Sequence, residues 1–275
     1  MAAHGVDVLL LGREGNARYV SGARRLFLAG ERAFAPGCVV VRETGAVHLL
    51  SATDFGIPAE VPRDNLYAPS WNPATLVARV TAIPGVNRAR TIGVDGLTPL
   101  FEALLPDAEL VDGEAVMRRA RRIKTPVEVD MIRAAATVAN TVMSAALDAA
   151  HGGEPVKAVA METMAAQGVT TAAFEPRVHR DGDRVTIAVS VLREGWEADV
   201  TRTTPDVENT AVDRCRPGVE VADLGADVHG VGLGYEVLRP DDVLEPGMVL
   251  SVGVEGVRDT VLVTERGAPE VLTAI

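Results

Sequence analysis

Residues 121–136 read RRIKTPVEVDMIRAAA, and this stretch contains the clearest local signal in the chain. Thr125 can cap a helix, Pro126 suits the first helical position, and Glu128 stands three residues after the cap. The sequence therefore predicts that a helix begins at this point. Apolar residues then recur at helical spacing as far as Gly152 and Gly153, so we expect a long helix with one buried face.

A second helical segment covers residues 154–167, and beyond it the apolar pattern changes from helical spacing to a period of two. Such alternation is typical of strands with one buried face. It occurs in four runs that glycine and proline residues separate, namely residues 185–191, 199–203, 248–254 and 260–264. We therefore expect residues 121–275 to form helices packed on an antiparallel sheet.

Residues 1–120 show a different organisation, in which short apolar runs alternate with segments of helical spacing. The apolar runs are residues 6–11, 38–41 and 47–50, and the helical segments include residues 73–83 and 97–105. This alternation predicts a layered α/β domain. The expected fold class is therefore α/β (α+β), with one domain over residues 1–120 and a second over residues 121–275.

The composition argues against several classes of protein. The chain has 275 residues with 27 Lys and Arg against 38 Asp and Glu, and a net charge of −11 does not suit nucleic-acid binding. No run approaches the roughly 18 apolar residues of a membrane span, and the N-terminus lacks the basic start of a signal peptide. Cys38 and Cys215 lie far apart, outside any disulfide or metal motif. We therefore expect a cytoplasmic protein that binds neither nucleic acid nor a membrane.

Several motifs resemble those of one known family. The sequence NARYVSG at residues 16–22 is similar to the N-x-R-Y-x-x-G opening of the creatinase, prolidase and aminopeptidase P proteins. Residues 122–128 resemble the R-x-I-K-S-P-x-E segment that starts their catalytic domain. Further matches are GWEADVTRT (195–203), RPG (216–218), HGVGL (229–233), LEPGM (244–248) and DTVLVTE (259–265). The resemblance implies a creatinase-like N-terminal domain followed by a truncated pita-bread domain.

The resemblance also identifies the positions of metal ligands. Active peptidases of this family hold two divalent metal ions between five ligands, and two dications need mostly carboxylate ligands to offset their charge. Asp199 and His229 match two of the five ligands. The other three positions are occupied by Ala188, Gly253 and Arg258. We therefore expect no metal, no cofactor and no metallopeptidase activity.

Two nearby carboxylates leave one alternative open. Glu255 or Asp259 would replace a lost ligand if the local alignment shifted by a residue or two, although the carboxylate missing at Ala188 would still be absent. The chain is also short for this family, because it lacks much of the stretch between Gln167 and Asp183 and a helix between Asn209 and Pro217.

The remaining polar residues suggest a different chemistry. The second histidine of relatives, seven residues after the ligand histidine, is replaced here by Glu236. His229, Asp199 and Glu236 provide the residue types of an acid/base set, and creatinase hydrolyses a small amidine-type substrate without a metal. The competing interpretation is that His229 and Asp199 are inherited residues satisfied by ordinary hydrogen bonds.

Three hypotheses of function follow. The first is a non-catalytic binding or scaffold subunit that takes a small molecule or short peptide. The second is a metal-independent hydrolase or lyase acting on a small amide, amidine or amino-acid-like compound. The third is an ordinary Xaa-Pro peptidase, against which the ligand count argues. The resemblance further implies a homodimer.

Overall fold

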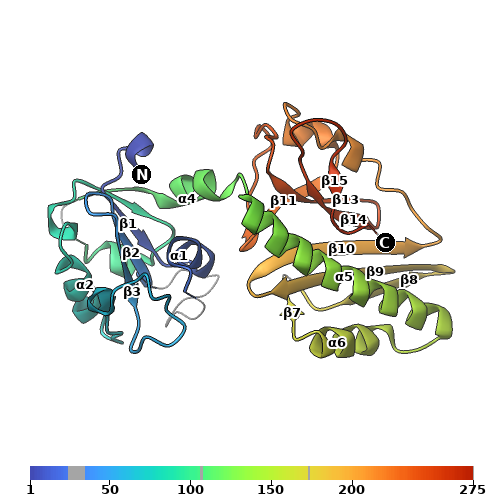
Figure 1. Cartoon of the computed structure of the whole chain (residues 1–275), viewed down its shortest axis with the longest axis horizontal. Coiled ribbons are helices and arrows are strands. Elements are labelled where there is room, and N and C mark those ends of the chain that lie inside the picture. Colours follow the sequence, from blue (N-terminus) through green and yellow to red (C-terminus); the bar gives the residue numbers. More distant parts are fainter. Residues whose placement is uncertain (24–34, 106–107, 173, 275) are drawn as a thin grey trace. The chain divides into compact units, whose positions relative to one another are not determined.

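The computed structural model describes residues 1–23, 35–105, 108–172 and 174–274. The chain forms two compact units, Met1–Ala120 and Arg121–Ile275, each with its own sheet (Figure 1). This mixed α/β architecture confirms the predicted fold class. Among the helices in the described ranges, none is long and apolar enough to cross a membrane.

The first unit contains a six-stranded mixed sheet. In spatial order its strands are β4 (Leu66–Tyr67), β3 (Ala46–Leu50), β2 (Cys38–Val41), β1 (Val8–Leu11), β5 (Thr91–Val94) and β6 (Glu109–Asp112). β1 runs antiparallel to β2 and parallel to β5. The helices are α1 (Glu14–Ser21), α2 (Pro73–Thr81), α3 (Pro99–Glu102) and α4 (Gly113–Arg121), with short 3-10 helices at Ala2–His4, Arg63–Asn65 and Val86–Arg88.

Strand β1 has the sequence VLLL, and all four of its side chains are buried because helices cover both faces of the sheet. Val8 and Leu10 pack in one core with residues of α2 and α3. Leu9 and Leu11 pack in a second core with residues of α1 and α4. The sequence predicts a helix over residues 97–105. In the structure only Pro99–Glu102 is helical, so the helix is shorter than predicted.

The second unit opens with the helix that the sequence predicts most clearly. Helix α5 (Pro126–Gly152) begins with a capping box, in which the Glu128 amide donates to Thr125 Oγ1 at 3.3 Å and the Thr125 amide donates to Glu128 Oε2 at 2.8 Å. It ends at Gly153, whose φ of 73° is favourable for glycine. Helix α6 (Val156–Ala166) follows, and two 3-10 helices lie at Val212–Arg214 and Val221–Leu224.

The second unit contains a nine-stranded antiparallel sheet. Its main path runs through β12 (Gly234–Glu236), β11 (Asp227–Gly232), β13 (Val249–Val254), β14 (Val257–Leu262), β10 (Trp196–Thr204), β9 (Arg184–Arg193) and β7 (Thr170–Thr171). In addition, β8 (Arg177–Asp181) pairs with β9, and β15 (Glu270–Val271) pairs with β14.

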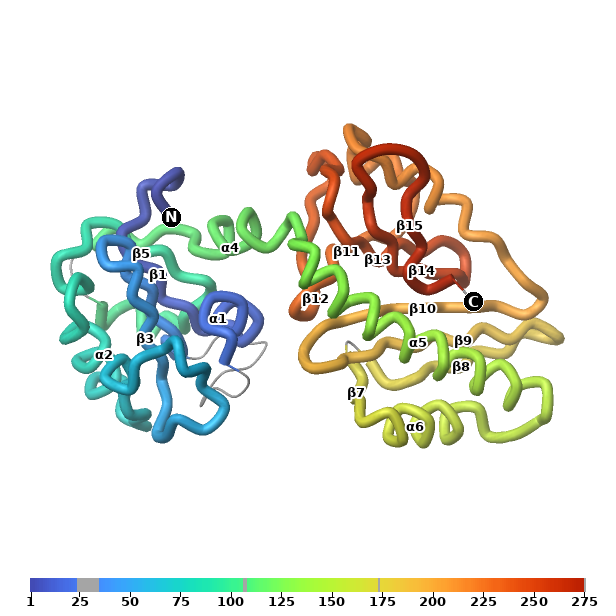
Figure 2. The backbone as a smooth tube through the Cα atoms, viewed as in Figure 1, coloured from blue at the N-terminus to red at the C-terminus, as the bar shows by residue number. Residues whose placement is uncertain are grey.

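Helix α5 crosses the outer face of this sheet and contacts β9 and β10 (Figure 2). The small residues of α5, Ala135, Ala139 and Ala146 among them, pack against the strand side chains that point toward the helix, such as Val189 and Val200. Since side chains alternate along a strand, the intervening residues of β9 and β10 point to the opposite face. That opposite face carries the polar residues of the candidate site.

Candidate functional site

Strand β10 presents two buried carboxylates to the face away from α5. Ala198 and Val200 pack in the core beneath α5, so Glu197 and Asp199 point to the other side of the sheet. Each of these two residues is only 1% exposed. The backbone of Asp199 is fixed by Thr260 of β14, whose Oγ1 accepts from the Asp199 amide and donates to the Asp199 carbonyl, both at 2.9 Å.

Strand β11 brings His229 to Asp199. His229 Nε2 lies 3.1 Å from Asp199 Oδ2, and the histidine side chain is 11% exposed. The imidazole stacks on the ring of Tyr235, with 4.5 Å between the ring centroids and an interplanar angle of 24°. Two of the three site residues expected from the sequence are therefore adjacent.

The surroundings of Asp199 favour its ionised form. Burial raises the pKa of this carboxyl, but contacts with His229, Ser190 and Ser251 outweigh that effect and hold the pKa of Asp199 below its ordinary value of 3.8. Ser190 lies opposite Asp199 on β9, and Ser251 lies opposite His229 on β13. Asp199 is therefore a carboxylate at neutral pH.

Glu197 is a member of the cluster that sequence reasoning missed. One ligand atom each from Glu197, Asp199 and His229 lies within 4.8 Å of the other two. The available signal was the spacing of Glu197 and Asp199, because residues two apart on a strand share a face. This arrangement of two carboxylates and one imidazole has the donor types of a divalent metal site.

The structure places Glu236 elsewhere. Glu236 on β12 lies opposite Gly230, the residue after His229, so its side chain is on the other face of the sheet from the imidazole. There Glu236 pairs with Lys124 at 2.7 Å and with Arg121 at 3.4 Å. The register of β12 thus directs Glu236 toward two cations, on the face of the sheet opposite to the His229–Asp199 pair.

The three positions of lost ligands do not carry acidic side chains, and one carries a cation. Ala188 lies opposite Thr201 on β10, and Gly253 lies opposite Arg258 on β14. A Cβ added at Gly253 would lie 2.6 Å from Arg258 Nη2, so the guanidinium covers this glycine. Arg258 Nη1 donates to Ser251 Oγ at 2.8 Å, and Nη2 pairs with Asp227.

Neither alternative carboxylate joins the cluster. Glu255 is exposed in the turn between β13 and β14, with a φ of 30°. Asp259 follows Arg258 on β14 and therefore points to the opposite face, where it accepts hydrogen bonds from Arg202 and Asn209 at 2.7 and 2.9 Å. Both oxygens of Asp259 are used in this network, since Arg202 and Thr273 donate to Oδ1 and Asn209 donates to Oδ2.

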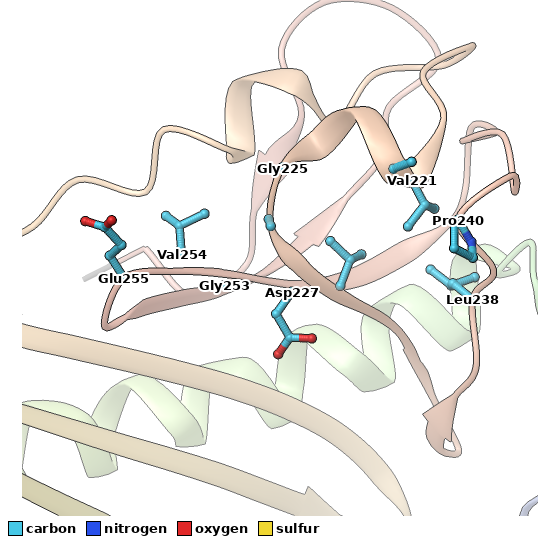
Figure 3. Close-up of a pocket in the computed structure, with 11 residues that line it drawn as sticks. Val221, Gly225, Asp227, Leu238, Pro240, Gly253, Val254 and Glu255 are labelled. Carbon is cyan, nitrogen blue, oxygen red and sulfur yellow. The ribbon is translucent and has the colours of Figure 1, made fainter.

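A pocket of about 650 Å³ lies beside the Arg258–Asp227 pair. It is lined by residues from β11, β13, the 3-10 helix Val221–Leu224 and the adjoining loops, including Val221, Leu238, Val254, Asp227 and Glu255. Figure 3 shows the Asp227 carboxylate pointing away from Val221 and Pro240. Most residues that line the pocket are aliphatic, and Asp227 and Glu255 supply its carboxylates.

Residues 1–123 match the model of the creatinase/prolidase N-terminal domain. This match assigns residues 1–123 to the creatinase/prolidase N-terminal domain family, and over the whole chain the similarity to prolidases is one of fold. An Xaa-Pro dipeptidase of Pyrococcus horikoshii is 22% identical over 342 aligned positions, which cover 98% of this chain and 93% of the relative. The uncharacterised peptidase YqhT of Bacillus subtilis is 25% identical over 235 positions, which cover 61% of this chain and 67% of the relative.

The solved structures confirm the pita-bread fold. The prolidase of Pyrococcus furiosus superposes with a TM-score of 0.75 at 20% identity, covering 100% of this chain and 97% of the prolidase. The alignment with the Pyrococcus horikoshii dipeptidase has 342 positions, more than the 275 residues of this chain. The alignment therefore contains gaps on the side of this chain.

Proposed function

We propose that this protein does not hold paired metal ions, is not an active Xaa-Pro metallopeptidase, and serves as a binding subunit for a small molecule or short peptide. The observation that carries the proposal is the position of Arg258, whose guanidinium covers Gly253 and pairs with Asp227. Both Gly253 and Arg258 stand where the family resemblance places glutamate ligands. A fixed cation thus lies where the peptidases need anionic side chains.

The charge balance supports this proposal. Paired dications carry four positive charges, and the family positions retain only Asp199 and His229 to offset them. A like charge within about 4 Å of a metal ion costs several kcal/mol at an effective dielectric constant of about 20. Glu197 adds one carboxylate, which is too little to compensate for three missing ligands and an added guanidinium.

Metal content and peptide hydrolysis together test the proposal. Purified full chain without an affinity tag is equilibrated with excess Mn²⁺ or Co²⁺, desalted, and analysed by inductively coupled plasma mass spectrometry. The same preparation is assayed with a panel of Xaa-Pro dipeptides. We expect fewer than two ions per chain and no dipeptide cleavage. Two tightly held ions together with cleavage would refute the proposal.

A second candidate function is a metal-independent hydrolase or lyase for a small amide, amidine or amino-acid-like compound. It is favoured by the 3.1 Å separation of His229 Nε2 and Asp199 Oδ2, because a buried carboxylate can orient an imidazole for proton transfer. Any such turnover should resist chelators and disappear in His229→Ala. Turnover that persists in His229→Ala would eliminate this candidate.

The homodimer remains a proposal that the family resemblance alone supports. Size-exclusion chromatography coupled to light scattering measures the mass directly. A mass near twice the 28.9 kDa of one chain is expected, and a mass equal to one chain at micromolar concentration would contradict the dimer.

A further inference from the structure

A compact cluster of metal-donor side chains is formed by Glu197, Asp199 and His229. The family's ligand pattern includes Asp199 and His229 but not Glu197. Two of these residues come from β10 and the third from β11, so residues about thirty positions apart in the chain converge at one place. One donor atom from each lies within 4.8 Å of the others. Glu197 is not at a position where the resemblance expects a ligand.

One carboxylate oxygen in this set lacks a partner. Asp199 Oδ1 is buried and accepts no hydrogen bond from any residue in the described part of the chain. The Asp199 side chain is only 2% exposed. Buried polar atoms are normally satisfied, and a carboxylate oxygen without a hydrogen-bond partner inside a donor cluster is suited to accept a cation or an ordered water.

The charge of the set suits one ion and not two. Glu197 and Asp199 together supply two negative charges when both are ionised, which balance a single dication. The nearby Arg258 is already paired with Asp227 and hydrogen-bonded to Ser251. An imidazole with two carboxylates is a donor set typical of zinc and other first-row transition metals, whereas Mg²⁺ and Ca²⁺ prefer oxygen ligands alone.

We propose that Glu197, Asp199 and His229 bind one divalent transition-metal ion, with Zn²⁺ as the best match to the donor set. Glu197 takes the place of a lost ligand from a new position on β10, two residues before Asp199, so that one ion is held in place of two. The inference goes beyond the proposed function, which requires only that two ions are not held. The remaining coordination positions are open to water or to a ligand.

The test uses the full chain freed of any affinity tag and stripped with a chelator. Isothermal titration calorimetry with ZnCl₂ gives stoichiometry and affinity, and absorption spectra of the Co²⁺-loaded protein report the ligand geometry. We expect one site per chain. Glu197→Gln and His229→Ala should each weaken Zn²⁺ binding by at least about tenfold.

The matched control is Glu208→Gln, which removes an exposed carboxylate outside the cluster and should bind Zn²⁺ like the unaltered protein. Circular dichroism of each metal-free variant shows whether it is folded, and the stoichiometry of the unaltered chain tests the inference even if a variant fails to fold. No binding would overturn this inference and leave the proposed function intact. Two bound ions would overturn both, and one ion whose affinity is unchanged in Glu197→Gln would overturn the assignment of ligands.

Discussion

The position of Glu236 leads to a prediction that separates a structural role from a catalytic one. Glu236 pairs with both Lys124 and Arg121, at 2.7 and 3.4 Å. The side chain of Lys124 is 1% exposed and that of Arg121 is 7% exposed. Burial lowers the pKa of Lys124, and the charge of Glu236 opposes that shift.

Glu236→Gln should therefore destabilise the second unit. Breaking a buried ion pair by removing one partner costs about 3–5 kcal/mol, and the 10% exposure of Glu236 places the expected loss near the lower end, about 3 kcal/mol. Replacing Lys124 and Glu236 together, as in Lys124→Met with Glu236→Leu, should cost less than Glu236→Gln alone, because the buried Lys124 ammonium is then removed with its partner and only Arg121 loses an ion pair. Any ligand binding or turnover should persist in Glu236→Gln.

Urea denaturation followed by circular dichroism measures these free energies of unfolding. Glu208→Gln is the matched control, since it makes the same chemical change at an exposed site, and should differ from the unaltered protein by less than about 0.5 kcal/mol. A Glu236→Gln variant as stable as Glu208→Gln would refute the structural role of Glu236. A Glu236→Gln variant that is stable but has lost a measured turnover would instead show a catalytic role.

Three further predictions concern the second unit. Thr125→Ala removes the side-chain acceptor of the α5 capping box and should lower the free energy of unfolding by about 1 kcal/mol, and an unchanged thermal midpoint would contradict this. Ala139→Leu inserts a larger side chain between α5 and the sheet and should cost about 1–3 kcal/mol in urea denaturation, whereas a gain in stability would show that this contact is loosely packed. Because the pKa of Asp199 is lowered on folding, its ionised form stabilises the protein above the ordinary value of 3.8, and that contribution is lost as the pH falls through the folded pKa. Asp199→Asn should therefore show a weaker loss of stability on acidification below about pH 4 than the unaltered protein, and parallel acid titration curves would contradict the assignment.

The parts of the fold that sequence predicts best are those with local signals. The capping residues Thr125 and Glu128 locate the start of α5 because their side chains bond the first turn of the same helix. Strands β9 and β10 alternate regularly and were predicted within a few residues. Strand β11, whose sequence is DVHGVG, was not predicted as a strand, because its glycines interrupt the apolar alternation.

The candidate site could be predicted only in part, because its geometry depends on pairing between strands. The meeting of His229 with Asp199 follows from the family resemblance. The face of the sheet on which the Glu236 side chain lies depends on the register between β11 and β12, because a shift of one residue would move this side chain to the other face. No local feature of the β12 sequence reveals that register. Glu197 was overlooked because its alternation with Ala198 also fits an ordinary strand with one polar face.

We propose above that this protein does not hold paired metal ions. Anomalous diffraction from crystals soaked in Mn²⁺ or Co²⁺ tests it most directly, with Ala188→Asp/Gly253→Glu/Arg258→Glu as the comparison in which all three lost ligands are restored. We expect fewer than two anomalous peaks near Asp199 and His229 in the unaltered protein. Two fully occupied peaks in the unaltered protein would contradict it.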